Sequence, residues 1–139
     1  MTMPDVSTSQ ALQLWCAQSG ERDLIVRARS AAGTAQSVGQ AFAIGVQAAI
    51  AHLTRNRYSD SLCAVAVSED TGNHPRQMQC TLSAGQVLQG HKSFVTLGQS
   101  ARVLLVLARD SEGVLRMASL LREQPGVQVR PLPALDFVP

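Results

Sequence analysis

Two stretches decide the fold expected for this chain, residues 64–76 (AVAVSEDTGNHPR) and 86–97 (QVLQGHKSFVTL). In the first, a short apolar strand delivers Ser68 into a glycine-containing turn. In the second, Gly90 fits a two-residue hairpin turn, because glycine accepts positive φ, and the return strand ends near Thr96. Each stretch therefore predicts a strand whose end presents hydroxyl and amide groups to a flat, polar-edged ligand.

The second half of the sequence is rich in short β-branched and apolar runs bounded by polar residues and glycine, which is typical of strands. Strands are predicted at residues 62–67, 78–82, 86–88, 92–97, 102–108, 115–121 and 127–129. Residues 103–108 are apolar without alternation, so both faces of that strand are expected to be covered. Three prolines near the C-terminus are expected to stop regular pairing.

The first half has helical spacing instead. Helices are predicted around residues 12–17, ending at Gly20, at 21–32, ending at Gly33, and at 35–53, capped by Thr34. The last is apolar on two sides, which predicts burial between neighbours, with Gln47 among the solvent-facing glutamines. Its first apolar face comprises Ala35, Val38, Phe42, Val46, Ala49 and Leu53, and its second Ala43, Ile44, Ala48 and Ala51.

Helices followed by antiparallel strands predict an α+β fold, with a helical segment at residues 1–57 and a β-domain at 58–139. The 139 residues carry a formal charge of +2, so no basic face suggests a nucleic acid partner. Three cysteines without paired spacing argue against a disulfide framework. No signal peptide and no membrane-spanning run is recognisable, and we expect a cytoplasmic protein.

Four residues are candidates for holding a ligand: Ser68, Glu69, Phe94 and Thr96. Strand alternation predicts that Phe94 and Thr96 share a face, where a ring and a hydroxyl would stack on and hydrogen-bond to a flat heterocycle. Plainer interpretations remain open. Ser68 and Glu69 also fit a turn that joins two strands, and Phe94 also fits a core position.

Metal and nucleophile chemistry is not favoured by the sequence. His74, His91 and Cys80 lack the tight paired spacing of zinc sites, and nothing indicates a third group that would orient a histidine against the thiol. We therefore predict no metal site and no catalytic residue among these three.

The two stretches together resemble the acyl-CoA dehydrogenase family. In that family's middle β-domain a Thr/Ser-Glu pair ends one strand, and a later hairpin ends in Lys-x-aromatic-aliphatic-Thr. The corresponding residues here are Ser68-Glu69 and the run from Lys92 through Phe94 to Thr96. The resemblance covers roughly residues 62–139 and departs from the family pattern at Val65 and in the loop 71–75.

This resemblance implies a partial middle β-domain that binds FAD, with Ser68 near the flavin pyrimidine, Thr96 at the central ring nitrogen and Phe94 against the ring. It implies oxidation of an acyl-CoA thioester, with the catalytic glutamate expected in a C-terminal helical domain that would follow Pro139. Unpaired strands lead us to expect a homo-oligomer or a complementary subunit. The alternatives are a non-catalytic truncated relative acting as an interaction or ligand-binding module, and an unrelated α+β ligand-binding protein.

Overall fold

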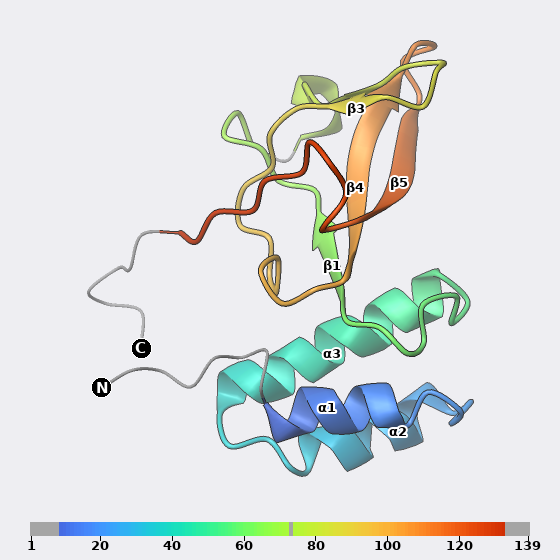
Figure 1. Cartoon of the computed structure of the whole chain (residues 1–139), viewed down its shortest axis with the longest axis vertical. Helices are drawn as coiled ribbons and strands as arrows, with labels where there is room; N and C mark the ends of the chain where they lie inside the picture. The colour runs from blue at the N-terminus through green and yellow to red at the C-terminus, as the bar shows by residue number, and fades with distance from the viewer. Residues whose placement is uncertain (1–8, 73, 133–139) are drawn as a thin grey trace.

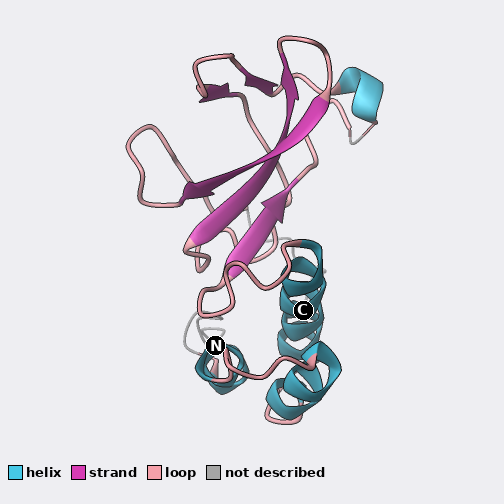
Figure 2. Ribbon diagram, turned by 90° about the vertical axis from the view of Figure 1, so that its right-hand side faces the viewer, coloured by secondary structure: helices cyan, strands magenta, loops and turns pink. Residues whose placement is uncertain are grey.

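The computed structural model describes residues 9–72 and 74–132. Helices come first in this part of the chain and strands follow, with the helices packed together at one end of the sheet (Figures 1 and 2). The predicted α+β fold is confirmed. The elements are α1 (Gln10–Ala17), α2 (Leu24–Ala32), α3 (Val38–Leu53), β1 (Cys63–Ala66), the 3₁₀ turn η2 (Pro75–Gln77), β2 (Thr81–Leu82), β3 (Leu88–Gln89), β4 (Val103–Asp110) and β5 (Leu115–Leu121).

Strand β4 is the centre of the sheet. One of its edges pairs with β5 in antiparallel register, from Val103↔Leu121 to Arg109↔Leu115. Its other edge pairs in parallel with β1 and, further along, with β2. The sheet is therefore mixed, and the expectation of purely antiparallel strands was wrong. The long segments that separate β1 and β2 from β4 return the chain to the same end of the sheet, as parallel pairing requires.

The two faces of β4 belong to different cores, as its unbroken apolar run predicted. Val103 and Leu105 pack with Ile50 of α3 and Cys63 of β1. Leu104, Val106 and Ala108 belong to a second cluster, which contains Cys80. One face of β4 thus contacts α3 through Ile50, where the strand begins, and the opposite face is left for the cleft described below.

Helix α3 differs from the prediction in where it begins and in which of its faces is buried. It begins at Val38, where the Ser37 hydroxyl accepts a hydrogen bond from the Gln40 amide, and not after Thr34. Most of the first predicted face is exposed, with Val38 at 88%, Phe42 at 62% and Leu53 at 77% of full exposure. Ala35 and Val46 of that face are half-buried against the core. The buried residues of the helix are Ala43, Ile44, Gln47, Ile50 and Ala51.

Gln47, expected in solvent, is buried and joins α3 to the sheet. Its amide nitrogen donates to the Cys63 carbonyl at 2.8 Å, and its amide oxygen accepts from the Cys63 N–H at 2.9 Å. A glutamine side chain carries the same donor and acceptor as a peptide unit. It therefore satisfies the outer edge of β1 as a neighbouring strand would.

Candidate functional site

The two stretches singled out in the sequence meet in the structure. The Ser93 N–H donates to the Ser68 carbonyl at 2.9 Å. The Lys92 ammonium donates to the Val67 carbonyl at 3.1 Å. These two contacts place the end of β1 beside the loop that follows β3, although the segments are more than twenty residues apart in sequence.

Glu69 lies at the centre of this junction. Its carboxylate accepts hydrogen bonds from the backbone N–H of Gln79 at 2.7 Å and of Cys80 at 2.9 Å. It also forms an ion pair with Lys92 at 2.8 Å, in which the side chains of Lys92 and Glu69 are only 7% and 6% exposed. The carboxylate therefore ties together three segments: the end of β1, the approach to β2, and the loop after β3.

The same contacts control the ionisation of Glu69. Burial by itself raises the pKa of this carboxyl. The hydrogen bonds from Lys92, Gln79 and Cys80 outweigh burial and hold the pKa below its ordinary value. Its backbone N–H and carbonyl are both bonded to Gly72, at 3.1 and 2.8 Å. Glu69 is thus an ionised structural residue whose backbone and side chain both bind the protein itself.

Phe94 stands out on the loop that follows β3. Its side chain is 73% exposed, and its φ of 55° lies in the left-handed region, where a bulky residue is uncommon. Leu97 has the same kind of backbone, with φ 62°. The strand predicted at residues 92–97 does not form, because left-handed residues break the extended path, and the alternation argument for Phe94 and Thr96 fails with it.

The remaining predicted residues flank this loop. Thr96 is exposed and Ser68 is half-buried. The hairpin is also displaced, since β2 pairs with β3 through the turn at residues 83–87, and not across Gly90. Gly90, with φ 150°, lies against Cys80, and an added Cβ would come within 2.8 Å of the Cys80 Cα. A close backbone approach requires this glycine.

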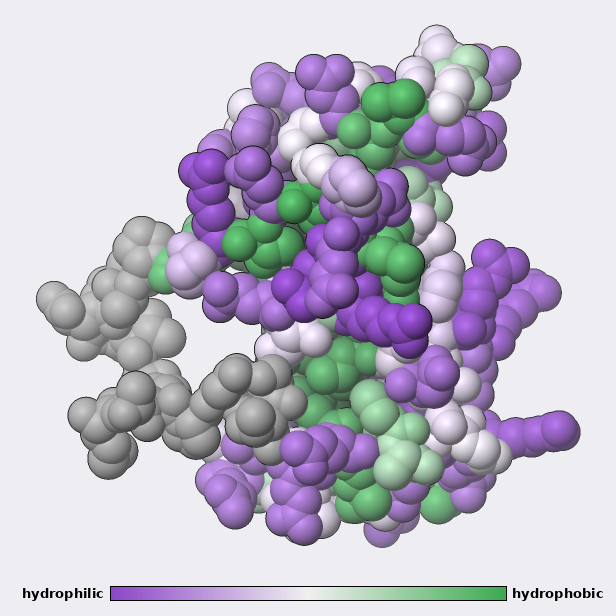
Figure 3. Space-filling view, in the orientation of Figure 1, coloured by the Kyte–Doolittle hydropathy of each residue, from purple (hydrophilic) through white to green (hydrophobic). Residues whose placement is uncertain are grey.

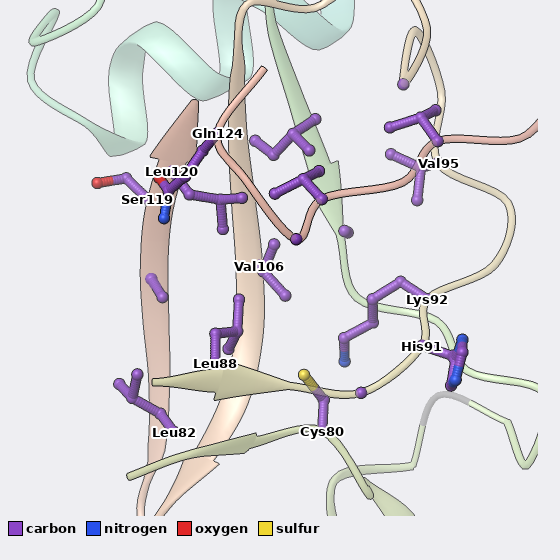
Figure 4. Close-up of a pocket in the computed structure, with 18 of the residues that line it drawn as sticks. Cys80, Leu82, Leu88, His91, Lys92, Val95, Val106, Ser119, Leu120 and Gln124 are labelled. Carbon is purple, nitrogen blue, oxygen red and sulfur yellow. The ribbon is translucent and has the colours of Figure 1, made fainter. Parts of the chain in front are cut away.

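A cleft of about 1720 Å³ lies over the face of β4 that carries Leu104 and Val106. Sequence reasoning missed this cleft. In Figure 4, Leu88, Val106 and Leu120 line its sheet side, and Lys92 and Val95 its loop side. Residues 124–132 close another side as irregular chain, where a strand was predicted at 127–129. Figure 3 shows apolar side chains in the β part framed by hydrophilic ones. In the sequence, the apolar residues Val127 and Val129, on either side of Gln128, were the signal that could have indicated this side of the cleft.

Of the four predicted ligand residues, Phe94 alone lines this cleft. Ser93 also lines it, so the cleft adjoins the Ser68–Ser93 hydrogen bond. The Cys80 thiol also lines the cleft, but burial raises its pKa, which disfavours the reactive thiolate. Within residues 9–72 and 74–132, no group of three or more histidine, cysteine, aspartate or glutamate side chains is placed to hold a metal ion. No helix in the same ranges has the length and apolar character needed to cross a membrane.

Comparison with known proteins gives a likeness of fold. No family model matches the sequence, and no curated protein matches it. A solved acyl-CoA dehydrogenase complexed with FAD, from Bacillus anthracis, superposes over 93% of this chain with a TM-score of 0.58 and 18% identity. An FAD complex of PigA superposes over 87% of the chain, with a TM-score of 0.55 and 18% identity. The chain spans 27% and 39% of those two proteins. The architecture is therefore that of part of an acyl-CoA dehydrogenase-type structure.

Proposed function

We propose that this chain provides a flavin-facing surface of an FAD-dependent, acyl-CoA dehydrogenase-like protein. The observation that carries the proposal is Phe94, an aromatic ring held in solvent by a left-handed backbone next to the Ser68–Ser93 hydrogen bond. Strained, exposed residues of this kind concentrate at ligand sites. The likeness in fold to two FAD-complexed proteins supports the choice of ligand.

In this proposal three side chains face the cofactor. The Phe94 ring offers a flat apolar surface, and the hydroxyls of Ser68 and Thr96 each offer one hydrogen-bond donor. All three side chains are accessible to a ligand, because Phe94 and Thr96 are exposed and Ser68 is partly so. When bound, FAD would supply hydride-accepting chemistry, and an acyl thioester is the proposed substrate class.

Glu69 has a different role in the proposal from the one first expected. Its carboxylate is engaged by Lys92 and two backbone N–H groups, so it does not fit as a direct flavin ligand. We assign it to positioning, because it fixes Lys92 within the loop that carries Phe94. Its lowered pKa and burial also make it a poor general base.

A titration of FAD into the purified chain, followed by quenching of flavin fluorescence, tests the proposal. We expect saturable quenching, weakened by about 10-fold in Phe94→Ala and by a smaller factor in Thr96→Ala. Ile25→Ala, which removes an exposed apolar side chain from α2, serves as the matched control and should leave the titration unchanged. Quenching that does not saturate, or that is unaffected by Phe94→Ala, would overturn the proposal.

The cleft supports a second candidate function, a non-catalytic ligand-binding module. Its sheet side is apolar, as expected of a site for a small apolar ligand. An environment-sensitive apolar dye distinguishes the two candidates. Dye binding that is weakened by Leu88→Gln, in a chain that does not bind FAD, would favour the module.

A further inference from the structure

The solvent-facing side of α3 carries apolar residues where a surface helix normally carries charged ones. Val38, Phe42 and Leu53 are 88%, 62% and 77% exposed, and Gly45 and Ala49 between them are exposed as well. We call these five residues the α3 stripe. They recur at steps of three and four, so they form one continuous line along the helix.

The rest of the fold already occupies the other side of α3. Ala43, Ile44 and Ala51 pack in the helical core with α1 and α2, and Ile50 packs against β1 and β4. The stripe points away from these contacts. An apolar line of this length on an otherwise folded surface is typical of an interface.

The order of residues in the stripe is self-complementary. When two copies of α3 run antiparallel about a two-fold axis between residues 45 and 46, Phe42 of each copy lies opposite Ala49 of the other. Val38 likewise lies opposite Leu53, so that larger residues face smaller ones in both pairs. Gly45 lies at the crossing, and an added Cβ there would meet nothing within 4 Å, so the space above it is open.

We propose that the α3 stripe binds a second copy of this chain, as an antiparallel helix pair related by two-fold symmetry. Such an isologous contact needs only one patch that matches itself, and the paired spacing supplies this match. A partner with a charged surface would lose hydration without gaining an ion pair, since α3 has no lysine, arginine, aspartate or glutamate. A membrane surface fits less well, because helices that lie on membranes carry lysine and arginine on their polar face.

The test uses a charge pair across the proposed contact. Sedimentation velocity of the full chain, at about 1 to 200 µM, should show a concentration-dependent dimer. Phe42→Glu and Ala49→Arg should each raise the dimer dissociation constant by about 100-fold or more, because each buries an unpaired charge. An equimolar mixture of the two variants should dimerise again, since the introduced carboxylate of one chain would face the introduced guanidinium of the other. Ile25→Glu, an exposed site on α2, is the matched control and should leave the dimer intact.

Circular dichroism of each variant checks that the fold is retained, which is expected for exposed positions. A native chain that stays monomeric at the highest concentration, about 200 µM, would overturn the proposal. So would single variants that dimerise normally, or a mixture of the two that does not recover. Single variants that dimerise normally would assign the dimer to another surface. A mixture that does not recover the dimer would exclude the antiparallel register.

Discussion

Replacing Glu69 with glutamine should destabilise the β part of the molecule strongly. The substitution removes the negative charge opposite Lys92, whose side chain is 7% exposed and whose ammonium would face only uncharged acceptors such as the Val67 carbonyl. It also replaces one carboxylate oxygen by an NH₂ group, which cannot accept the hydrogen bond from the Gln79 N–H if it takes one position or from the Cys80 N–H if it takes the other. Breaking a buried pair in this way typically costs about 3 to 5 kcal/mol, and we expect about 3 kcal/mol here.

Urea unfolding followed by far-ultraviolet circular dichroism measures this loss of unfolding free energy. We expect a lower urea midpoint and an unchanged dependence of the free energy on urea concentration. The difference should depend on pH. Because the pKa of Glu69 is lowered in the folded state, its contribution is fully present above the unfolded pKa of about 4.3 and is lost as pH falls through the folded value. The midpoints of the native chain and of Glu69→Gln should therefore be far apart at pH 7 and converge in acid.

Two further variants make the test specific. Lys92→Met should cost a similar amount alone, and the double variant with Glu69→Gln should cost clearly less than the sum, because neither charge is then left unpaired. Glu123→Gln is the surface comparison, since Glu123 is 85% exposed and water screens its ion pair with Arg122. A loss of unfolding free energy below about 1 kcal/mol in Glu69→Gln would refute the role assigned to this carboxylate. So would urea midpoints of the native chain and the variant that do not converge in acid.

The remaining predictions concern packing and thiol reactivity. Gly90→Ala should destabilise the fold by about 2 to 3 kcal/mol, measured by urea unfolding, because the added Cβ would lie 2.8 Å from the Cys80 Cα. Gln47→Leu should cost about 2 kcal/mol in the same assay, because the Cys63 N–H and carbonyl lose their partners; a neutral result would contradict the edge-capping role. A thiol reagent at pH 8 should modify Cys16 first, because Cys16 is half-buried whereas Cys63 and Cys80 are buried. Burial raises the pKa of all three thiols, that of Cys63 to about 11, and early labelling of Cys63 would argue against its burial.

Element types were predictable from the sequence wherever periodicity was strong. The period changes from helical to strand-like between Leu53 and Cys63, which is where the structure changes. The side of α3 that faces the core was not predictable, because both sides are apolar and the composition does not indicate which of them is buried. Gln47 was misplaced for a related reason: glutamine is usually solvated, and only the open edge of β1 gives this one a buried partner.

The candidate site was predictable as a meeting of two segments and less so in its details. The resemblance implied that the two segments lie close together, and they meet at the hydrogen bond between the Ser93 N–H and the Ser68 carbonyl. The loop conformation at Phe94 was missed because non-glycine residues seldom adopt positive φ, so no local signal marked it. The Glu69–Lys92 pair was missed because its partners come from three separate segments, and their proximity depends on the tertiary structure.

The way strands attach to β4 sets an order in which the sheet should open. Hairpin β2–β3 is anchored to β4 only at Thr81↔Arg109 and Leu82↔Asp110, whereas β5 pairs along nearly the whole of that strand. Amide hydrogens of β2 and β3 should consequently exchange with deuterium well before those of β4. Because this hairpin forms one wall of the cleft, its detachment would widen the entrance while β1 stays attached to the helices. A ligand could then enter without global unfolding.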